Sequence, residues 1–540
     1  MILMMNTPLL LTSFLKRAER YFPHKEIISR TGPDTIHRIT YGEYVKRTRK
    51  LAAALTGLGM TRGTKVGTFA WNTHRHLEAY FAIPCSGAIL HTINIRLAPE
   101  HIVYIINHAE DEILLIDGDL FPLVEPALAL LTTVKHVIVM SDSKEAPASN
   151  FPNVHSYEAL LDAADDHFDF PEDLDENLPA GMCYTSATTG MPKGVVYTHR
   201  SIVLHSLALG LAESFGVKEN DIALPIVPMF HVNAWGFPFA AVNFGSTQIM
   251  PGPMFTPALL LDLVEQYGVT ITAGVPTIWM GVLAEQKKQP RDLSSLRLVI
   301  SGGSASPKGL IQAYNDELSI NYVNAYGMTE TSPLVTMSYP LSTMEDYTKD
   351  ELDNLRVTQG LTVSLVETEI VNENGPVPWD NATMGELRIR GPWIASEYYK
   401  DDRTADAFRD GWLYTGDIAV MTKEGYVKIT DRTKDLIKSG GEWISSVDLE
   451  NALMSHPAVF EAAVIAIPHE KWLERPLACV VLHEGATATK EELLASLEDQ
   501  VAKWWIPDDV VFLNEIPKTS VGKFLKAKLR EEMKEFTFSS

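Results

Sequence analysis

Residues 184–194, YTSATTGMPKG, combine hydroxyl side chains, glycines and one lysine in a single short stretch. The stretch has too few large apolar side chains for a core segment, and its Pro-Lys-Gly end could not continue a helix. Hydroxyls, backbone N–H groups and the Lys193 ammonium are together suited to hold a polyphosphate. It is not a Walker A loop, because that motif needs Ser or Thr after the lysine, and here Gly194 follows. The alternative is an ordinary surface turn rich in Ser, Thr and Gly.

Three further stretches carry groups that suit nucleotide chemistry. NAYGMTETSP places Thr329 and Glu330 directly after a Tyr-Gly turn. GWLYTGD places Asp417 in a Thr-Gly-Asp turn and is followed by DRTKD, and PKTSVGK ends on Lys523. Taken singly, the glutamate is explained as well by a helix cap and the aspartate by a turn. The set of stretches, not any one of them, favours a nucleotide site.

In this order and at this spacing, the stretches resemble the adenylate-forming superfamily of acyl-CoA synthetases, peptide-synthetase adenylation domains and beetle luciferases. The resemblance covers essentially the whole chain. PMFHVNAWG, AGVPTIW and IKSGGEWISSVDLENAL look most like fatty-acyl-CoA ligases and methylmercaptopropionate-CoA ligases. The resemblance implies an α/β fold with a large N-terminal domain (1–431), a hinge (432–434) and a small mobile α+β domain (435–540).

The resemblance implies an AMP-forming acid–thiol ligase that uses ATP, Mg²⁺ and, as acyl acceptor, CoA. A carboxylate at neutral pH is a poor electrophile, so in this family it first attacks the α-phosphate of ATP, giving an acyl-adenylate and pyrophosphate. The implied catalytic residues are Lys193, Thr329, Glu330 and Lys523. Thr329 is expected beside the α-phosphate, and Glu330 and Thr185 are the implied Mg²⁺ ligands.

The other residues that the resemblance implies bind parts of ATP and CoA. The β- and γ-phosphates are expected on Thr185, Ser186, Thr188, Thr189, Gly190 and Lys193. Adenine is expected on Tyr326, with Gly302, Gly303, Ser304, Asn324, Ala325 and Gly327 around it. The ribose hydroxyls are expected on Asp417, helped by Arg432. CoA is expected at Ser439, Gly440, Gly441, Glu442 and Trp443, which follow Lys434 at the hinge.

Lys523 is expected to bridge the substrate carboxylate and the α-phosphate in the first half-reaction. Because Lys523 belongs to the small domain, that domain must deliver it and withdraw it. The resemblance implies a rotation of the small domain about Lys434 after adenylation, which brings KSGGEW to the CoA thiol. The thiol then attacks the acyl carbon and AMP leaves.

The acid substrate is expected to contact His231, Trp235, Gly302 and Pro333. A single histidine in an apolar run is otherwise a satisfied core residue. If this stretch is helical, Trp235 lies one turn after His231. It then either gates an acyl channel or forms its floor, or it is an ordinary core residue. Trp443 packs either on CoA or on the hinge. Ala187 stands where family loops usually carry glycine, which would cost about 1 kcal/mol if that position needs a positive φ.

The composition excludes several classes of partner. The chain has 540 residues with 46 Lys and Arg against 69 Asp and Glu, a net charge of −23. This acidity disfavours nucleic acid or an anionic membrane surface as the main partner. Three cysteines without CxxC spacing predict neither a zinc site nor a disulfide framework and indicate the cytoplasm, with a peripheral membrane position as the alternative. Apolar runs are all shorter than the ~20 residues of a membrane span.

Strands and helices alternate over the first four-fifths of the chain, which predicts layered α/β architecture with largely parallel sheets. The predicted buried strands are KVGTFAW, EILLIDGD, VKHVIVM, ALPIVPMF, STQIMPG and LRLVISGG. The predicted helices are HRHLEAYFAIPCSG, SIVLHSLALGLAESFG and ALLLDLVEQYG. Thr7 and Pro8 are predicted to begin an amphipathic helix that docks through Leu11, Phe14 and Leu15. Within the small domain, TKEELLASLEDQVAKWW is predicted to be helical.

Three classes of function compete. The leading one is a fatty-acyl-CoA synthetase for a medium- to long-chain acid, with a methylmercaptopropionate or short-chain acyl-CoA ligase as its alternative. A carrier-protein-loading adenylation enzyme is disfavoured, because HVNAW lacks the aspartate that would meet an amino-acid ammonium. A luciferase-like oxygenase would share the adenylation residues. The apolar first domain and its N-terminal helix are compatible with a homodimer.

Overall fold

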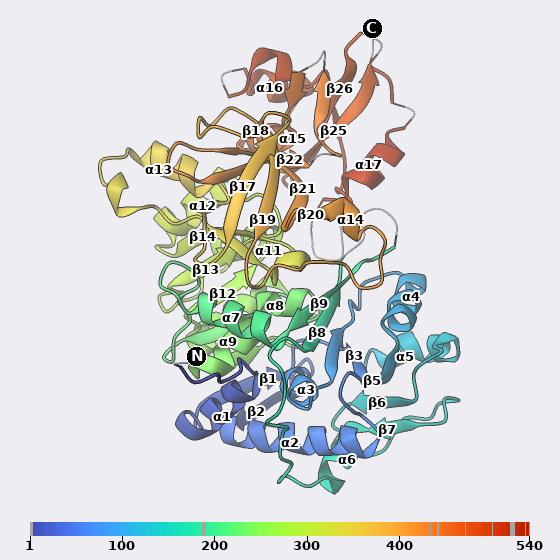
Figure 1. Cartoon of the computed structure of the whole chain (residues 1–540). Helices are drawn as coiled ribbons and strands as arrows, with labels where there is room; N and C mark the ends of the chain where they lie inside the picture. The colour runs from blue at the N-terminus through green and yellow to red at the C-terminus, as the bar shows by residue number, and fades with distance from the viewer. Residues whose placement is uncertain are drawn as a thin grey trace.

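A computed structural model describes residues 4–185, 191–432, 434–439, 442–469, 471–498, 500–518, 524–534 and 536–538. Two layered α/β units form the lower part of the molecule in Figure 1, with an antiparallel sheet above them. We call these parts, through Arg432, the large body. A smaller α+β unit, which we call the small unit, follows from Lys434 and lies at the top.

The first sheet has the order β7-β6-β5-β3-β4-β8-β9 and is parallel except for the β8–β9 hairpin. Its strands are β3 (Lys65–Phe69), β4 (Ile89–Thr92), β5 (Asp111–Asp117), β6 (His136–Met140), β7 (Val154–Ser156), β8 (Pro179–Tyr184) and β9 (Gly194–Thr198). Side chains of β3, β4 and β5 are buried almost without interruption, as expected for parallel strands covered on both faces.

The second sheet has the order β16-β15-β14-β13-β12-β10-β11-β1-β2 and is parallel from β14 to β1. Its strands are β1 (Glu26–Arg30), β2 (Ile36–Thr40), β10 (Ile222–Pro225), β11 (Thr247–Met250), β12 (Ile271–Gly274), β13 (Leu298–Ser301), β14 (Asn321–Gly327), β15 (Leu334–Met337) and β16 (Leu361–Thr362). The carboxyl ends of β13 and β14 carry the Gly-Gly-Ser and Tyr-Gly turns, so parallel order brings these two turns to one edge.

The remaining strands belong to two other sheets. The antiparallel sheet of the large body contains β17 (Glu367–Asn372), β18 (Gly375–Pro376), β19 (Gly385–Arg390), β20 (Phe408–Arg409), β21 (Trp412–Met421) and β22 (Val427–Arg432). The sheet of the small unit contains β23 (Ile437–Ser439), β24 (Glu442–Ile444), β25 (Val459–His469), β26 (Leu473–Leu482) and β27 (Asp509–Phe512). β22 is therefore the last strand of the large body before the small unit begins.

Helices cover these sheets (Figure 1). They are α1 (Thr12–Tyr21), α2 (Tyr41–Gly57), α3 (His74–Cys85), α4 (Pro99–Ala109), α5 (Phe121–Val124), α6 (Tyr157–Ala163), α7 (His199–Leu209), α8 (Val232–Trp235), α9 (Phe237–Phe244), α10 (Pro257–Tyr267), α11 (Pro276–Lys288), α12 (Lys308–Gln312), α13 (Lys349–Arg356), α14 (Thr404–Ala407), α15 (Ser446–Met454), α16 (Lys490–Ala495) and α17 (Lys526–Glu532). The predicted strands and the three internal helices of the large body are all confirmed, because long buried apolar runs fix these elements locally.

Three predicted helix boundaries are wrong. The helix predicted over residues 201–216 ends at Leu209, and turn structure follows it. The first helix begins at Thr12 and not at Pro8, although Phe14 and Leu15 are buried as predicted. The preceding backbone is tied to the large body instead: the Leu9 N–H donates to Glu176 at 2.8 Å. In the small unit the helix ends at Ala495, where the Ser496 hydroxyl donates to a carbonyl of the last turn, and the described residues from there to Trp505 are not α-helical.

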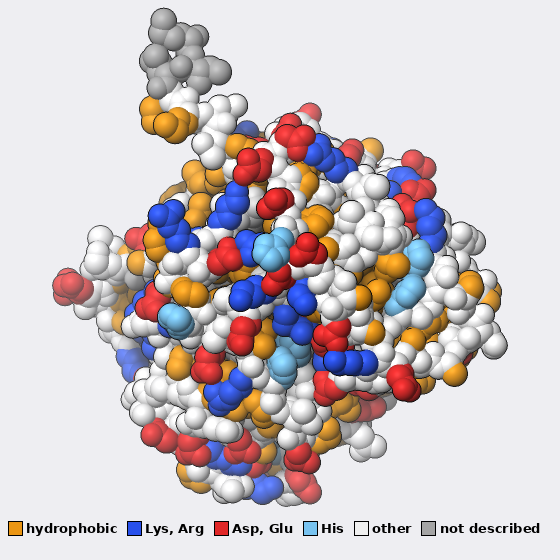
Figure 2. Space-filling model, turned by 90° about the horizontal axis from the view of Figure 1, so that it is seen from below, with side chains coloured by type: hydrophobic (Ala, Val, Ile, Leu, Met, Phe, Trp, Pro, Cys, Tyr) orange, Lys and Arg blue, Asp and Glu red, His pale blue; other side chains and the backbone are white. Residues whose placement is uncertain are grey.

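Figure 2 shows one face of the surface, on which Lys and Arg side chains are interspersed with Asp and Glu. Within the described part of the chain, no helix has the length and apolarity needed to cross a bilayer.

Asp117, at the end of β5, gives a testable pH dependence of stability. Burial raises the pKa of this carboxyl to about 7, although the Trp71 N–H donates to it at 2.7 Å. Since the folded-state pKa lies above the unfolded one, the folded state binds the extra proton, and stability is lost as the pH rises through about 7. Asp117→Asn should therefore stabilise the protein at pH 8 by on the order of 3 kcal/mol and much less at pH 5.

Thermal unfolding of the wild type and Asp117→Asn at both pH values measures this effect. Asp34→Asn, in an exposed turn, serves as the control for loss of a carboxylate. An equal gain at pH 5 and pH 8 would contradict a raised pKa at Asp117.

Candidate active site

A cavity of about 580 Å³ lies where the second sheet, the antiparallel sheet and the small unit meet. Of the predicted site residues, those that line it are Thr185, Lys193, His231, Trp235, Gly302, Gly303, Ser304, Asn324, Ala325, Tyr326, Gly327, Thr329, Glu330, Pro333, Asp417, Arg432 and Lys434. Residues from five distant stretches thus share one cavity. Its size is in the range of small-molecule sites, roughly 300–1,000 Å³.

Hydrogen bonds join the two ends of the predicted phosphate loop. β8 and β9 form an antiparallel hairpin, and the Thr185 N–H donates to the Lys193 carbonyl at 2.9 Å. The Lys193 N–H donates in return to the Thr185 hydroxyl at 3.1 Å. The predicted residues Ser186, Ala187, Thr188, Thr189 and Gly190 lie outside the described residues. This pairing therefore places Thr185 and Lys193, which come from opposite ends of the loop, next to each other at the cavity.

Tyr398 links two of the predicted catalytic groups. Its hydroxyl donates to Glu330 Oε1 at 2.6 Å, and the Lys193 ammonium lies 3.9 Å from the centre of its ring. Glu330 is buried, and the Ala395 N–H fixes its backbone carbonyl at 2.8 Å. Burial lowers the pKa of Lys193, and Glu330 partly restores it. The Tyr398 side chain thus contacts the Lys193 ammonium through its ring and the Glu330 carboxylate through its hydroxyl.

Replacing Tyr398 with phenylalanine should separate these two contacts. The variant keeps the ring under Lys193 but removes the hydrogen bond to Glu330, and a bond to a charged acceptor contributes about 1.5–3 kcal/mol. We expect about tenfold more Mg²⁺ to be needed for half-maximal adenylation, because the carboxylate loses the group that orients it. Mg²⁺ titrations of activity measure the effect, with Tyr399→Phe as the neighbouring control. An unchanged Mg²⁺ requirement would contradict an orienting role.

The part of the cavity where the nucleoside is predicted to bind contains Asp417 on β21. The Tyr326 hydroxyl donates to its Oδ2 at 2.5 Å, and Arg432 Nε lies 3.0 Å from its Oδ1. Burial and the Asp417 carboxylate raise the pKa of the Tyr326 phenol well above its ordinary value, so it remains a donor. Each oxygen of Asp417 retains a second lone pair for a sugar hydroxyl.

Gly302 allows a close approach of the backbone to Ala325, beside Tyr326. A Cβ at this position would lie 2.7 Å from the Ala325 carbonyl oxygen and 3.3 Å from the Trp235 ring. A side chain here would therefore displace the wall of the cavity at the edge where adenine is predicted.

The short segment α8 after His231 is a left-handed turn and not a right-handed helix, so the expected helical spacing to Trp235 does not hold. Residues 232–235 have positive φ values, from 39° at Val232 to 58° at Trp235, followed by Gly236 at 74°. A left-handed conformation costs an L-residue about 1–2 kcal/mol. Only Asn233 and Gly236 favour it locally, so few residues of this stretch indicate the turn. The turn leaves both His231 and Trp235 on the cavity wall.

Of the predicted CoA-binding residues, Ser439 lies on β23 and Glu442 and Trp443 lie on β24 of the small unit. Ser439 pairs with Glu442 in this hairpin, and the Lys438 ammonium lies 5.0 Å from the centre of the Trp443 ring. Trp443 is 41% exposed and does not line the cavity. Gly440, Gly441 and Lys523 lie outside the described residues, as does the side chain of Glu442.

Several side chains of the site were missed by the sequence analysis. Besides Tyr398, they include Tyr197, whose hydroxyl donates to the Thr329 carbonyl at 2.7 Å, and Arg403, whose guanidinium donates to the Met191 carbonyl at 3.1 Å. Lys526 and Arg530 of α17 also line the cavity. For these residues, the one signal in the sequence was the aromatic pair in EYYKD (397–401), which contains Tyr398. The others stand at no fixed spacing from the motifs that the sequence analysis used.

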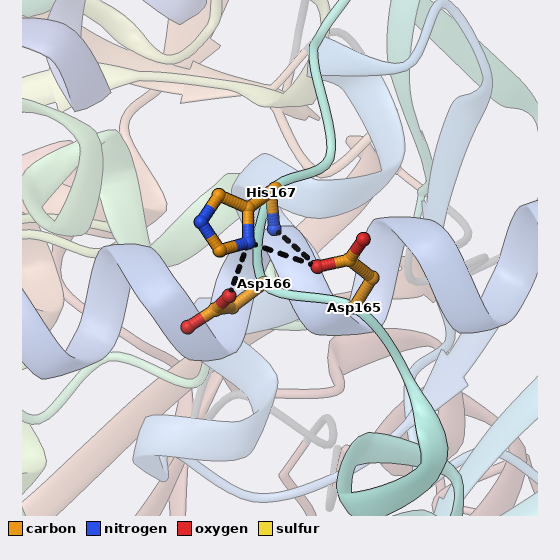
Figure 3. A group of neighbouring side chains, drawn as sticks. All are labelled: Asp165, Asp166 and His167. Atoms are coloured by element: carbon orange, nitrogen blue, oxygen red, sulfur yellow. Dashed lines mark hydrogen bonds and ion pairs between the residues drawn. The ribbon is translucent and has the colours of Figure 1, made fainter.

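A separate group, Asp165, Asp166 and His167, places three potential metal ligands close together (Figure 3). His167 Nδ1 lies 3.0 Å from Asp165 and 2.8 Å from Asp166, and the histidine side chain is 87% exposed. The group lies in a surface loop and does not line the cavity. Exposed carboxylates commonly gather in this way without an ion, so we assign it no role.

Comparison with known families matches the AMP-binding enzyme model over residues 14–399 and the AMP-binding enzyme C-terminal domain over residues 448–523. The chain belongs to the AMP-binding enzyme family. The predicted superfamily, fold class and ligase class are thereby confirmed. The exact domain limits and the roles of individual residues remain predictions.

The relatives that match this chain over nearly its whole length include ligases for fatty acids and for 3-methylmercaptopropionate. The chain is 48% identical to a long-chain-fatty-acid–CoA ligase of Thermus thermophilus, over 99% of this chain and 97% of the relative. It is 43% identical to a 3-methylmercaptopropionyl-CoA ligase of Ruegeria lacuscaerulensis, over 98% of each. A medium-chain-fatty-acid–CoA ligase of Ectopseudomonas oleovorans is 41% identical, over 98% of this chain and 97% of the relative.

Solved structures show the same fold. An anthranilate CoA ligase in complex with anthranoyl-AMP has a TM-score of 0.88 at 25% identity, covering 98% of both chains. ATP-bound MatB from Rhodopseudomonas palustris has a TM-score of 0.82 at 26% identity, covering 97% of this chain and 99% of that chain.

Proposed function

We propose that this AMP-binding enzyme is a fatty-acyl-CoA ligase. The observation that carries the proposal is a cavity lined by both charged or polar and apolar side chains. Asp417, Tyr326, Glu330 and Lys193 are among the charged or polar ones. The apolar side chains that line the cavity are Phe215, Val232, Trp235, Pro276, Met280 and Leu334. Such a cavity suits a nucleotide joined to an aliphatic acid, and the long-chain and medium-chain relatives support this substrate class.

In the first half-reaction, the carboxylate oxygen of the acid attacks the α-phosphorus of ATP, and pyrophosphate leaves. Tyr326 and Asp417 hold the nucleoside, while Lys193 offsets charge on the outer phosphates. Lys523 would offset the charge that develops between the carboxylate and the α-phosphate. These groups bind and orient; the chain itself supplies no nucleophile.

The site has a donor set that suits Mg²⁺. Glu330 offers a carboxylate oxygen and Thr185 a hydroxyl, and Mg²⁺ prefers oxygen ligands with one or two carboxylates beside the substrate phosphates. Tyr398 fixes one oxygen of Glu330, which turns the carboxylate toward a defined position. Bound there, Mg²⁺ would neutralise phosphate charge.

In the second half-reaction, the thiol of CoA attacks the acyl carbon, and AMP leaves. We propose that the small unit turns about residues 432–434 between the two steps. The turn would withdraw Lys523 and present Ser439 and Trp443 to CoA. The exposed Trp443 ring with Lys438 beside it offers a surface for a group that carries both an aromatic base and phosphates.

Product analysis tests the proposal. The full chain is incubated with Mg-ATP, CoA and single acids from acetate through methylthiopropionate and octanoate to oleate, and nucleotides and thioesters are separated. We expect AMP, pyrophosphate and acyl-CoA, with the highest kcat/KM between octanoate and oleate. Formation of ADP would overturn the mechanism.

A ligase for methylmercaptopropionate is the second candidate. Two Ruegeria relatives with this activity in their names are 43% and 42% identical over 98% of the chain. A maximum of kcat/KM at methylthiopropionate in the same series would favour this candidate.

A further inference from the structure

Buried ionic and hydrogen-bonding side chains join the small unit to the large body beside the cavity. Asp431, on β22 of the large body, is 1% exposed. Its Oδ2 accepts hydrogen bonds from the Ser446 N–H at 2.8 Å and from the Ser446 hydroxyl at 2.6 Å. Ser446 begins α15, and Figure 1 shows α15 next to β22. We call Asp431, Ser446, Glu450 and Lys526 the junction cluster.

Lys526 is the only cation among the four members of the junction cluster. Its ammonium lies 2.7 Å from Glu450 Oε1 and donates to the Ser446 hydroxyl at 2.5 Å. The side chains of Lys526 and Glu450 are only 10% and 9% exposed. The Ser446 hydroxyl therefore accepts a hydrogen bond from Lys526 and donates one to Asp431, so it links α17 to β22.

The electrostatics of the cluster depend on Lys526. Burial raises the pKa of Asp431, and burial raises that of Glu450 to about 7 against the lowering effect of Lys526. Burial by itself lowers the pKa of Lys526, but Glu450 and Asp431 outweigh it and raise it. Two buried carboxylates thus share one ammonium, and loss of that ammonium would leave buried negative charge without a partner.

Two neighbouring contacts also cross the junction. The Ser445 hydroxyl donates to the Thr430 carbonyl at 2.5 Å, and Lys428 lies 3.1 Å from Asp448. Thr430 and Lys428 belong to β22, whereas Ser445 and Asp448 belong to the start of α15. Within the small unit, α15 is anchored by Leu449 and Leu453 in a core cluster with β25 and β26, so it moves with that unit.

The position of the cluster relates it to the reaction. Lys526 and its neighbours Phe524 and Leu525 line the cavity, as does Glu450. Lys526 also follows Lys523 by three residues. Asp431 precedes the proposed hinge and Ser446 follows it, so a turn about residues 432–434 separates groups that are now in hydrogen-bond contact.

We propose that Lys526 is a positioning residue that holds the small unit on the large body in the orientation for adenylate formation, through Glu450, Ser446 and Asp431. The part of this inference that concerns the reaction steps rests on the proposed function, whereas the part that concerns the contact between the small unit and the large body does not. The junction cluster favours the first half-reaction and must open before the second. Substitution of Lys526 should therefore affect the two half-reactions unequally.

The test separates the half-reactions. Acyl-adenylate formation is measured in a single turnover without CoA, and thioester formation is measured from synthetic acyl-adenylate with CoA. Lys526→Met should slow the first step by roughly tenfold, a typical effect for residues in direct contact, and should leave the second unchanged or faster. Lys528→Met, an exposed lysine on the same helix, should change neither step.

Ser446→Ala provides a second variant, because it breaks the link from α17 to β22 and leaves the charges in place. It should shift the two steps in the same direction as Lys526→Met, by a smaller factor. Equal losses in both half-reactions, or no loss in either, would overturn the proposal.

Hydrogen exchange distinguishes failure of this inference from failure of the proposed function. Exchange at the start of α15 should be faster in full-length Lys526→Met than in the wild type or Lys528→Met, whatever the substrate. Unchanged exchange there would overturn the inference even in an active ligase. A wild type that forms no acyl-adenylate with any acid would overturn the function, and the exchange result would still decide the junction.

Discussion

Glu330→Gln is expected to lower kcat for acyl-adenylate formation by about 10²–10³-fold, the effect of losing one preorganised electrostatic group in a water-poor site. The substitution keeps the shape of the side chain, and the Tyr398 hydroxyl can still donate to the amide oxygen. What is lost is the negative charge that would attract Mg²⁺ and that partly restores the pKa of Lys193. The Mg²⁺ concentration for half-maximal activity should rise in parallel.

Steady-state kinetics at several Mg²⁺ concentrations and thermal unfolding measure these effects. Glu397→Gln is the matched control, because Glu397 is an exposed glutamate directly before Tyr398. An unfolding temperature near that of the wild type would show that the activity loss is local. Retention of full activity at low Mg²⁺ would remove Glu330 from the proposed metal site.

Asp417→Asn is expected to raise KM for ATP by about 10–100-fold, with a smaller effect on kcat. Hydrogen bonds to a charged group contribute about 1.5–3 kcal/mol each, and an amide offers one acceptor where the carboxylate offers two. Arg432, 3.0 Å from Asp417, would also lose its charge partner beside the nucleotide. The loss should appear mainly in binding, because the ribose does not change during the reaction.

Nucleotide binding without turnover gives a direct measure for this variant. Isothermal titration with AMP should show weaker binding to Asp417→Asn, and Asp410→Asn, an exposed residue in the turn before β21, should bind like the wild type. A fall in kcat with unchanged KM and AMP affinity would assign Asp417 to the chemical step and contradict a ribose-binding role.

The sequence by itself determined the elements and the parts of the site that sit at their ends. Buried apolar runs such as residues 113–116 of β5 predict strands because their preference is local and needs no knowledge of the partner strand. Asp417, Glu330 and Lys193 were found because each lies in a motif of fixed spacing, and the structure places all three on one cavity. Lys523 and residues 186–190 remain sequence predictions.

Only the tertiary structure decided how these motifs cooperate. Tyr398 meets Glu330 across 68 residues of sequence, and Lys526 meets Ser446 across 80. No local preference encodes such pairs, because they depend on how separate sheets and helices pack. The start of the first helix follows the same reason, because the Leu9 N–H just before it donates to Glu176, far along the chain. The left-handed turn at residues 232–235 also goes against local preference, since Val232, Ala234 and Trp235 do not favour a positive φ.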